Sequence, residues 1–162
     1  LSKDASCWYM EDQQTVMATN WYGNMFTAPD TLQVNTLTAG IADTYSKHYF
    51  QITPTGQEGF KEFGAIQSLT SVTKLLKKNG LSAKEIAFMP HQTSATLIDI
   101  WMQQLKPGQK LTTLLTVANV TVATHAFNFA WFDEKKEVKK DKLVMMALGP
   151  DMHSNAMLLK RG

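Results

Sequence analysis

Residues 56–79 carry the most regular pattern in the chain. Apolar side chains recur there at steps of mostly three and four residues, with charged side chains between them, which predicts one apolar stripe along a helix. Gly80 supplies the residue at which such a helix stops. A stripe of this length has to be buried against a second layer of structure, so it favours a layered architecture. The stripe consists of Phe60, Phe63, Ile66, Leu69, Val72, Leu75 and Leu76.

Strands and helices alternate after this helix. Ser82 and Glu85 have the spacing of a capping box, which predicts a single helical turn. Thr93 or Ser94 can cap the following long helix, and a Lys-Pro-Gly run ends it at 106–108. In chain order, the predicted elements are a helical turn at 82–85, a strand at 86–89, a helix at 97–105, a second buried strand at 111–117 and a small apolar helix at 121–130.

The C-terminal segment has the pattern of a β-hairpin. Two apolar runs, 143–148 and 156–159, are joined by the short turn Gly149-Pro150-Asp151. Two stretches near the start, 7–10 and 15–19, have the composition of extended structure. The order helix, strand, helix, strand, helix and hairpin predicts an α/β fold, in which covering helices pack on a layered sheet with its buried strands at the centre.

The composition fits one soluble domain. Of 162 residues 44% are hydrophobic and the net charge is +2, so we expect neither disorder nor a surface for nucleic acid or anionic lipid. Cys7 is the single cysteine, which excludes an internal disulfide and a cysteine-based zinc site and fits the cytoplasm. We expect no membrane span, because no apolar run reaches the ~18 residues required. The chain starts without a signal-peptide pattern or an initiator Met, so we expect it to begin inside a longer product.

Two polar residues occupy equivalent places in this pattern. His91 comes just after the strand at 86–89, and Asn119 comes just after the predicted strand at 111–117. Ligands of open α/β sheets bind in the crevice beyond the carboxyl ends of the strands, so these two side chains are candidates for one site. The alternative interpretation of each is a loop residue that only satisfies local hydrogen bonds.

The surroundings of His91 resemble a known family. Residues 80–105, centred on Glu85-Ile86-Ala87-Phe88-Met89-Pro90-His91-Gln92-Thr93, resemble the segment of β-ketoacyl-acyl carrier protein synthase III that carries the catalytic histidine. Residues 56–61 are similar to the start of a helix in that family, and residues 111–126 to its strand, catalytic asparagine and small-residue helix. The resemblance implies that residues 1–162 are the C-terminal half of a thiolase-like layered fold, with a mixed sheet and covering helices.

The resemblance also implies a chemistry. Decarboxylation of a malonyl thioester builds negative charge on the thioester oxygen, which the N–H groups of His91 and Asn119 can stabilise. Neither a metal nor a cofactor is implied, because the substrates are thioesters carried by acyl carrier protein or coenzyme A. The family's nucleophilic cysteine belongs to an N-terminal half that this chain lacks, so the implied partners are that half, on a separate or cleaved chain, and a second copy in a dimer. Cys7 lies in an extended aromatic stretch, and we expect a small buried hydrophobic residue there rather than a nucleophile.

Two positions depart from the family's pattern. The family's asparagine is normally preceded by Gly and followed by Thr or Ser, whereas Asn119 lies between Ala118 and Val120. The family's terminal hairpin carries glycines, one of whose amides binds the oxyanion, whereas the turn here is Gly149-Pro150-Asp151. Proline has no N–H to donate, so a contact worth about 3 kcal/mol is lost if Pro150 takes the donor position. A shift of one residue places Asp151 there instead.

Other polar and sulfur-containing residues have simpler interpretations. The remaining histidines, His48, His125 and His153, lack metal-ligand spacing and are expected at the surface or the edge of the core. The methionines are expected to fill the core, although an acyl tunnel is an alternative. Ser94 is expected to cap a helix. The basic stretch 135–142 is expected to be a solvated connection, with a docking surface for a carrier protein as the alternative.

Three functions therefore remain open on the sequence. The first is decarboxylative Claisen condensation of acyl and malonyl thioesters in fatty acid or polyketide-type biosynthesis, with His91 and Asn119 as donors to the enolate. The second is a non-catalytic subunit that pairs with an active ketosynthase, which the Pro150 turn favours. The third is acyl transfer to a hydroxyl or amine without decarboxylation, in which His91 is a base and Asn119 is dispensable.

Overall fold

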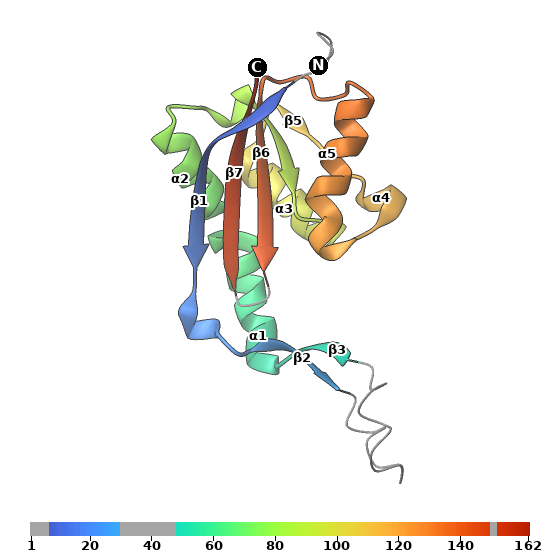
Figure 1. Cartoon of the computed structure of the whole chain (residues 1–162). Coiled ribbons are helices and arrows are strands. Elements are labelled where there is room, and N and C mark those ends of the chain that lie inside the picture. The colour runs from blue at the N-terminus through green and yellow to red at the C-terminus, as the bar shows by residue number, and fades with distance from the viewer. Residues whose placement is uncertain (1–6, 30–47, 150–151) are drawn as a thin grey trace.

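A computed structural model describes residues 7–29, 48–149 and 152–162. Its main element is a five-stranded sheet with the strand order β1-β7-β6-β4-β5 (Figure 1). The short strands β4 and β5, the latter at the edge, run parallel to β6, and the other neighbours are antiparallel, so the sheet is mixed, as predicted. Its strands are β1 (Trp8–Met17), β4 (Ile86–Pro90), β5 (Gln109–Lys110), β6 (Lys142–Gly149) and β7 (His153–Arg161).

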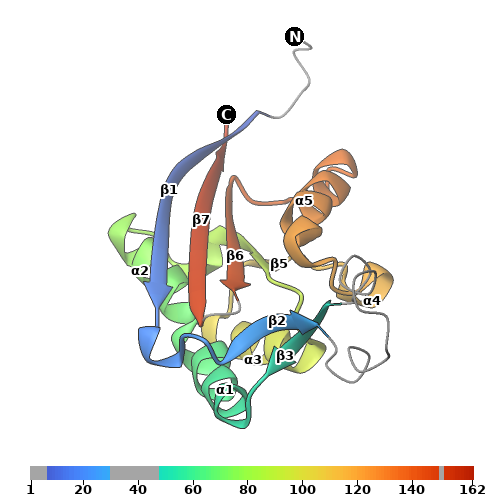
Figure 2. The same ribbon diagram turned by 60° about the horizontal axis from the view of Figure 1, so that its bottom comes forward.

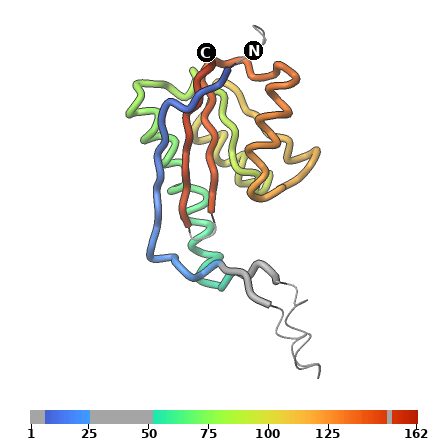
Figure 3. The backbone as a smooth tube through the Cα atoms, viewed as in Figure 1, coloured from blue at the N-terminus to red at the C-terminus, as the bar shows by residue number. Residues whose placement is uncertain are grey.

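A separate two-stranded ribbon lies beyond one end of this sheet. It pairs β2 (Met25–Pro29) with β3 (His48–Ile52) in antiparallel register and leads directly into the first helix (Figure 2). At the opposite end of the sheet the first and last described residues meet, since the amide of Gly162 donates to the carbonyl of Cys7 over 2.7 Å (Figure 3). Cys7 itself is exposed, so the expectation of a buried residue there is wrong: it precedes the first strand residue and lies outside both layers of the core.

The long predicted helix exists, with an irregular middle. It consists of α1 (Pro54–Gly59), a π-helical segment η3 (Phe60–Gln67) and α2 (Leu69–Lys78), and Gly80 follows with φ +64°. The wider turn shows in the bond from the Ser68 amide to the Phe63 carbonyl, five residues back. This wider turn rotates Ile66 out of the apolar stripe, which leaves it 63% exposed and corrects its predicted place in the core.

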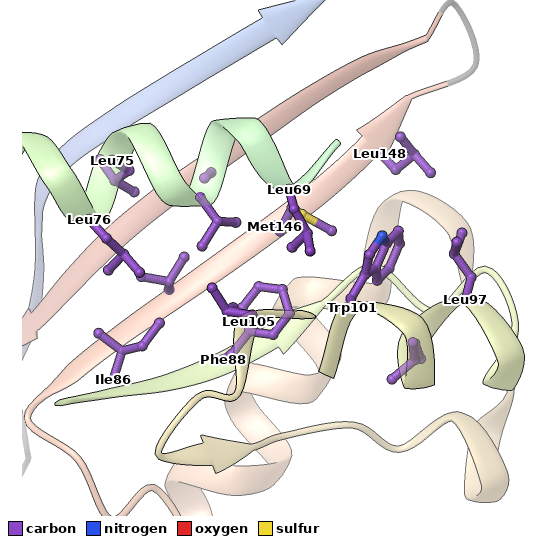
Figure 4. Close-up of a cluster of buried hydrophobic side chains, with 14 of the residues drawn as sticks. Leu69, Leu75, Leu76, Ile86, Phe88, Leu97, Trp101, Leu105, Met146 and Leu148 are labelled. Carbon is purple, nitrogen blue, oxygen red and sulfur yellow. The ribbon is translucent and has the colours of Figure 1, made fainter. Parts of the chain in front are cut away.

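The two faces of the sheet are covered by different helices. We call the first the α2/α3 face: α2 and α3 (Ala95–Leu105) pack there on side chains that include Phe88, Met146 and Leu148 (Figure 4). We call the second the α5 face: α5 (Thr124–Glu134) is the helix that covers it, over the smaller cluster that contains Met89 and Leu143. Successive strand residues point to opposite faces, which explains why every residue of β4 is buried.

The predicted strand at 111–117 is wrong in its extent. Pairing with β4 stops after Leu111, whose amide donates to the Phe88 carbonyl, and residues 114–117 form the short helix α4 (Leu114–Val117). The physical reason lies in β4, which ends at Pro90, a residue without an N–H to continue the ladder. The amide of Thr113 instead donates to the side chain of Gln92 over 2.6 Å.

The smaller predicted features are present. Ser82 and Glu85 form the capping box that opens the 3-10 turn at 83–85, and the side chain of Ser94 accepts from the Leu97 amide as the cap of α3. The terminal hairpin pairs β6 with β7 from Lys142↔Lys160 to Gly149↔His153. Within the described residues no helix has both the length and the apolar character needed to cross a membrane.

Candidate active site

A cavity of about 760 Å³ opens where β4 and β6 end and α5 begins. This volume lies within the range of pockets that hold small organic ligands. Its lining combines apolar side chains with several neutral polar groups, and none of the described lining residues is acidic, lysine or arginine. The apolar part includes Met25, Phe60, Val122, Ala147 and Leu148, and the polar part includes His91, Thr93, Asn119, His125 and His153.

His91 follows the last residue of β4 and is half-buried at the cavity wall. Burial, with a smaller contribution from the nearby His125, lowers the pKa of His91 from its ordinary value to about 4. The imidazole is therefore neutral near pH 7, and it has one N–H to donate and one nitrogen to accept. This is the state in which a histidine acts as an uncharged donor to a developing oxyanion.

Gln92, the next residue, points away from solvent and organises the loops around the site. Its buried Oε1 accepts from the amide of Thr113 and from the Asn128 side-chain amide at 3.0 Å, and its Nε2 donates to the carbonyl of Ala118 over 2.8 Å. One side chain thus joins the end of β4 to the loop before α4, to the loop before Asn119 and to α5. The position of Asn119 relative to His91 rests on this network.

Asn119 lies in the loop between α4 and α5 and lines the cavity with an exposed side chain. Its Oδ1 accepts from the Thr121 amide at 2.8 Å and from the Thr124 hydroxyl at 3.3 Å. The two acceptor contacts assign Nδ2 as the donor end, and Nδ2 has no partner among the described residues. The structure places His91 and Asn119 in the lining of one cavity, although Asn119 follows a helical turn and not a strand.

The residue before Asn119 has an unusual backbone. Ala118 has φ +60° and ψ −154°, a combination that is essentially restricted to glycine. An alanine pays strain energy in that conformation, because its Cβ approaches the neighbouring carbonyl groups. Alanine at position 118 therefore costs conformational energy that a glycine would avoid, although the loop keeps a glycine-type backbone conformation.

Two histidines of the cavity were not expected there. The ring of His125 lies 6.1 Å from the ring of His91, centroid to centroid, at an interplanar angle of 27°, and His153 lines the same cavity. Burial lowers the pKa of His125, and the backbone carbonyls of Met146 and Met89 partly offset that shift. The sequence contained one indication that His125 lies near the site: it comes six residues after Asn119, near the start of the predicted helix. The side chain of His48 lies outside the described residues.

Gly149 is the described residue of the predicted oxyanion turn, and it lines the cavity opposite His153. A Cβ atom at Gly149 would overlap the imidazole of His153, so only glycine leaves room for that ring. Pro150 and Asp151 lie outside the described residues, and their predicted effect on an oxyanion contact stays a prediction.

The structure also bears on the methionines, on Thr93 and on metal binding. Met146 and Met152 are fully buried in the core, in agreement with core filling, and Met25 is the methionine that lines the cavity among the described residues. Thr93 has a buried hydroxyl without a hydrogen-bond partner at the cavity wall. In the ranges that the structure covers, no three His, Cys, Asp or Glu side chains are grouped so that they could hold a metal ion.

The fold and its neighbours define a class. The chain has the thiolase-like α/β fold of condensing enzymes, a mixed sheet with helices on both faces. No family model matches the sequence, and no curated protein matches it.

Solved structures give the specific likeness. The 3-oxoacyl-(acyl carrier protein) synthase III of Pseudomonas aeruginosa superposes with a TM-score of 0.74 at 14% identity, over 93% of this chain and 45% of that enzyme. The corresponding synthase of Aquifex aeolicus gives 0.71 at 17% identity, over 99% and 46% of the two chains. A priming β-ketosynthase of a polyketide biosynthetic pathway gives 0.74 at 14% identity, over 93% and 44%. This chain therefore spans slightly less than half the length of these enzymes.

Proposed function

We propose that this chain is the C-terminal half of a ketosynthase-like enzyme that catalyses decarboxylative Claisen condensation of acyl and malonyl thioesters. The observation that carries the proposal is that His91 and Asn119 line one cavity, each with an N–H group available to a ligand. The fold shared with 3-oxoacyl-(acyl carrier protein) synthases and a priming ketosynthase supports the same chemistry.

The proposed reaction uses both donors in one step. The bond between the α-carbon and the carboxylate of the malonyl group breaks, carbon dioxide leaves, and the electron pair moves onto the thioester oxygen as an enolate. Neutral N–H donors from His91 and Asn119 stabilise that oxygen where water is excluded. The enolate carbon then attacks an acyl thioester, forming the new carbon–carbon bond and releasing the thiolate.

The acyl group has to be held by a nucleophile from elsewhere. Cys7, the single cysteine, is exposed and does not line the cavity. We therefore assign the nucleophilic cysteine to an N-terminal half on a separate or cleaved chain, and acyl carrier protein or coenzyme A to the delivery of the thioesters. The thinly covered α5 face leaves surface for such a partner, and dimerisation of the assembled protein belongs to the same proposal.

The test is the replacement of His91. In the assembled protein, His91→Ala is expected to abolish decarboxylation of a malonyl thioester, measured as release of labelled carbon dioxide, because the main donor to the enolate is lost. The exposed Gln104→Ala is a control that keeps its activity. Unchanged decarboxylation by the His91 variant would remove this residue from the mechanism.

Two alternatives are separated by further measurements. Acyl transfer without decarboxylation predicts that Asn119→Ala keeps its rate, whereas condensation predicts a loss of roughly 10²–10³-fold for a missing oxyanion donor. A non-catalytic subunit is favoured by Pro150, which has no amide hydrogen to offer in the hairpin turn. The intact mass of every polypeptide in the purified assembly addresses that case, since a condensing enzyme requires a second species that carries a cysteine.

A further inference from the structure

His91 and His125 form a pair of imidazoles from two separate elements. His91 follows β4, and His125 is the second residue of α5, yet their rings stack with centroids 6.1 Å apart and an interplanar angle of 27°. Both rings line the same cavity, so a charge on one ring is felt by the other.

Burial opposes a positive charge on His125, and the backbone carbonyls of Met146 and Met89 offset this only in part. His125 lies in the first turn of an 11-residue helix, where the helix dipole is positive, and its buried Nε2 has no hydrogen-bond partner. The elements packed around the pair contribute one further titratable group to the described cavity lining, which is His153 of β7. The ends of β4 and β6, η3 and the start of α3 contribute no carboxylate that would stabilise an imidazolium.

We propose that His125 is a positioning residue that keeps the ring of His91 uncharged, an inference that rests on the function proposed above. An imidazolium at position 91 would bind the carboxylate of a malonyl group as an ion pair, and that interaction is lost when the carboxylate leaves as carbon dioxide. It would stabilise the ground state more than the transition state and slow the step. A neutral ring donates instead to the oxygen on which charge develops.

The direction of the pKa shift at His91 agrees with this geometry. Burial is the larger cause and His125 the second, which together place the pKa at about 4. Coupling between two sites is reciprocal, so the two rings must oppose each other's protonation by the same amount. Burial alone predicts that protonation of one ring leaves the other ring unaffected, and this difference makes the proposal testable.

The test is a histidine titration by NMR on the full chain with labelled imidazoles. His125→Gln is expected to raise the pKa of His91, because the opposing charge at His125 is lost. In the parent protein the His125 resonances are expected to show a second step at low pH, where His91 takes up its proton, and His91→Gln is expected to remove that step. His153→Gln removes the third histidine of the cavity, which is not stacked on His91, and is expected to leave the His91 titration in place. If His125→Gln does not fold, the presence of that low-pH step in the parent and its loss in the His91→Gln protein report the same coupling.

The assembled enzyme gives a second readout. His125→Gln is expected to move the acidic limb of the decarboxylation profile to higher pH and, on that limb, to lower kcat and KM for the malonyl thioester together, as ground-state binding strengthens. Identical His91 titrations in the parent and the His125→Gln protein would overturn the inference, whatever the activity. Coupled titrations in an assembly that never decarboxylates would support the inference and refute the proposed function, so the two failures are distinguishable.

Discussion

The two faces of the sheet differ in how completely they are covered. On the α2/α3 face, two helices and η3 enclose a continuous cluster with fully buried members such as Trp101, Phe88 and Leu158. On the α5 face, one helix packs over β4 and β6, while the β1 side chain of Met17 is 65% exposed. Leu115 and Val122, in the segment that leads into α5, are 95% and 99% exposed. The fold therefore encloses the hydrophobic layer of the α2/α3 face fully and that of the α5 face only in part.

The hydrogen bonds follow the same division. On the α2/α3 face polar groups serve packing, as where Ser71 and Ser154 share a buried hydrogen bond of 2.8 Å between α2 and β7. Near the α5 face they hold loops: Gln92 ties three segments together, and the indole of Trp8 donates to Asp133 at 2.9 Å to fasten β1 to α5. The cavity with His91 and Asn119 lies at the edge of this less enclosed region. Side chains placed there need a scaffold of specific hydrogen bonds because packing alone does not fix their positions.

Two adjacent leucines of β7 provide a matched test of the faces. Leu158 is fully buried on the α2/α3 face, and Leu159 is partly buried on the α5 face. Leu158→Ala is expected to lower the free energy of unfolding by about 2–5 kcal/mol, and Leu159→Ala by clearly less, because less surrounding volume is left empty. Urea denaturation of the two variants measures both values. Equal losses would mean that the faces are packed equally well.

Replacement of Gln92 is expected to loosen the α5 side selectively. Gln92→Leu leaves the Thr113 amide and the Asn128 side chain buried without their acceptor, at a cost of roughly 2–4 kcal/mol for the two groups. Amide hydrogen exchange should accelerate at Thr113 and through α5 before it does so in α2. The exposed Gln103→Leu is the control for the chemical change. Uniform acceleration in both helices would show that Gln92 stabilises the whole molecule and not one face.

In the loop that leads into α5, we predict a substitution that raises the stability of the protein. Ala118→Gly is expected to stabilise the protein by about 1 kcal/mol, since strain at a glycine-type backbone conformation costs of order 1–3 kcal/mol and glycine adds unfolded-state entropy. The same change in the middle of α5, Ala130→Gly, is expected to destabilise by about 0.5–1 kcal/mol. Thermal unfolding of both variants tests the pair. A loss of stability in both would remove the strain argument.

The smallest expected effect concerns the edge of the α2/α3 face. Hydrogen bonds from Lys78, Asn79 and the Gln13 amide hold the pKa of Asp12 at about 2, below its ordinary value of 3.8. A lowered carboxyl pKa adds stability above pH 3.8 and loses it as the pH falls through about 2. Asp12→Asn should therefore lower Tm at pH 7 but not at pH 2. Asp99→Asn, at an exposed site, should not change Tm at either pH.

The spacing of apolar residues in the sequence predicted the elements whose side chains are buried at regular intervals. The long helix, the strand at 86–89, the helix after Ser94 and the hairpin follow from alternating or helical apolar patterns, and so does the mixed sheet. The pattern failed where one hydrogen bond decides the backbone. Ile66 faces solvent because η3 is π-helical, and residues 114–117 are helical because Pro90 ends the ladder and Gln92 captures the Thr113 amide.

The candidate site was predicted in the same uneven way. His91 was singled out because it follows a buried strand, and Asn119 because it follows a segment that was predicted as a strand and is helical at 114–117; both line the cavity. His125 and His153 were assigned to the surface or core edge, since their spacing in the sequence matches no ligand pattern. They reach the site through the first turn of α5 and the register that sets His153 opposite Gly149. Such tertiary juxtapositions leave no periodic trace in one sequence.

The place of Phe60 in the cavity wall depends on the π-helical winding of η3. Phe60 lines the cavity at the start of η3, whereas Leu69 and the rest of α2 pack on the sheet at its other end. Ordinary α-helical winding of this segment, with its length unchanged, would turn everything upstream of it relative to the core. Phe60 would leave the cavity, and the β2–β3 ribbon would be carried round with α1. The winding of this short stretch, as much as its composition, is thus under structural constraint.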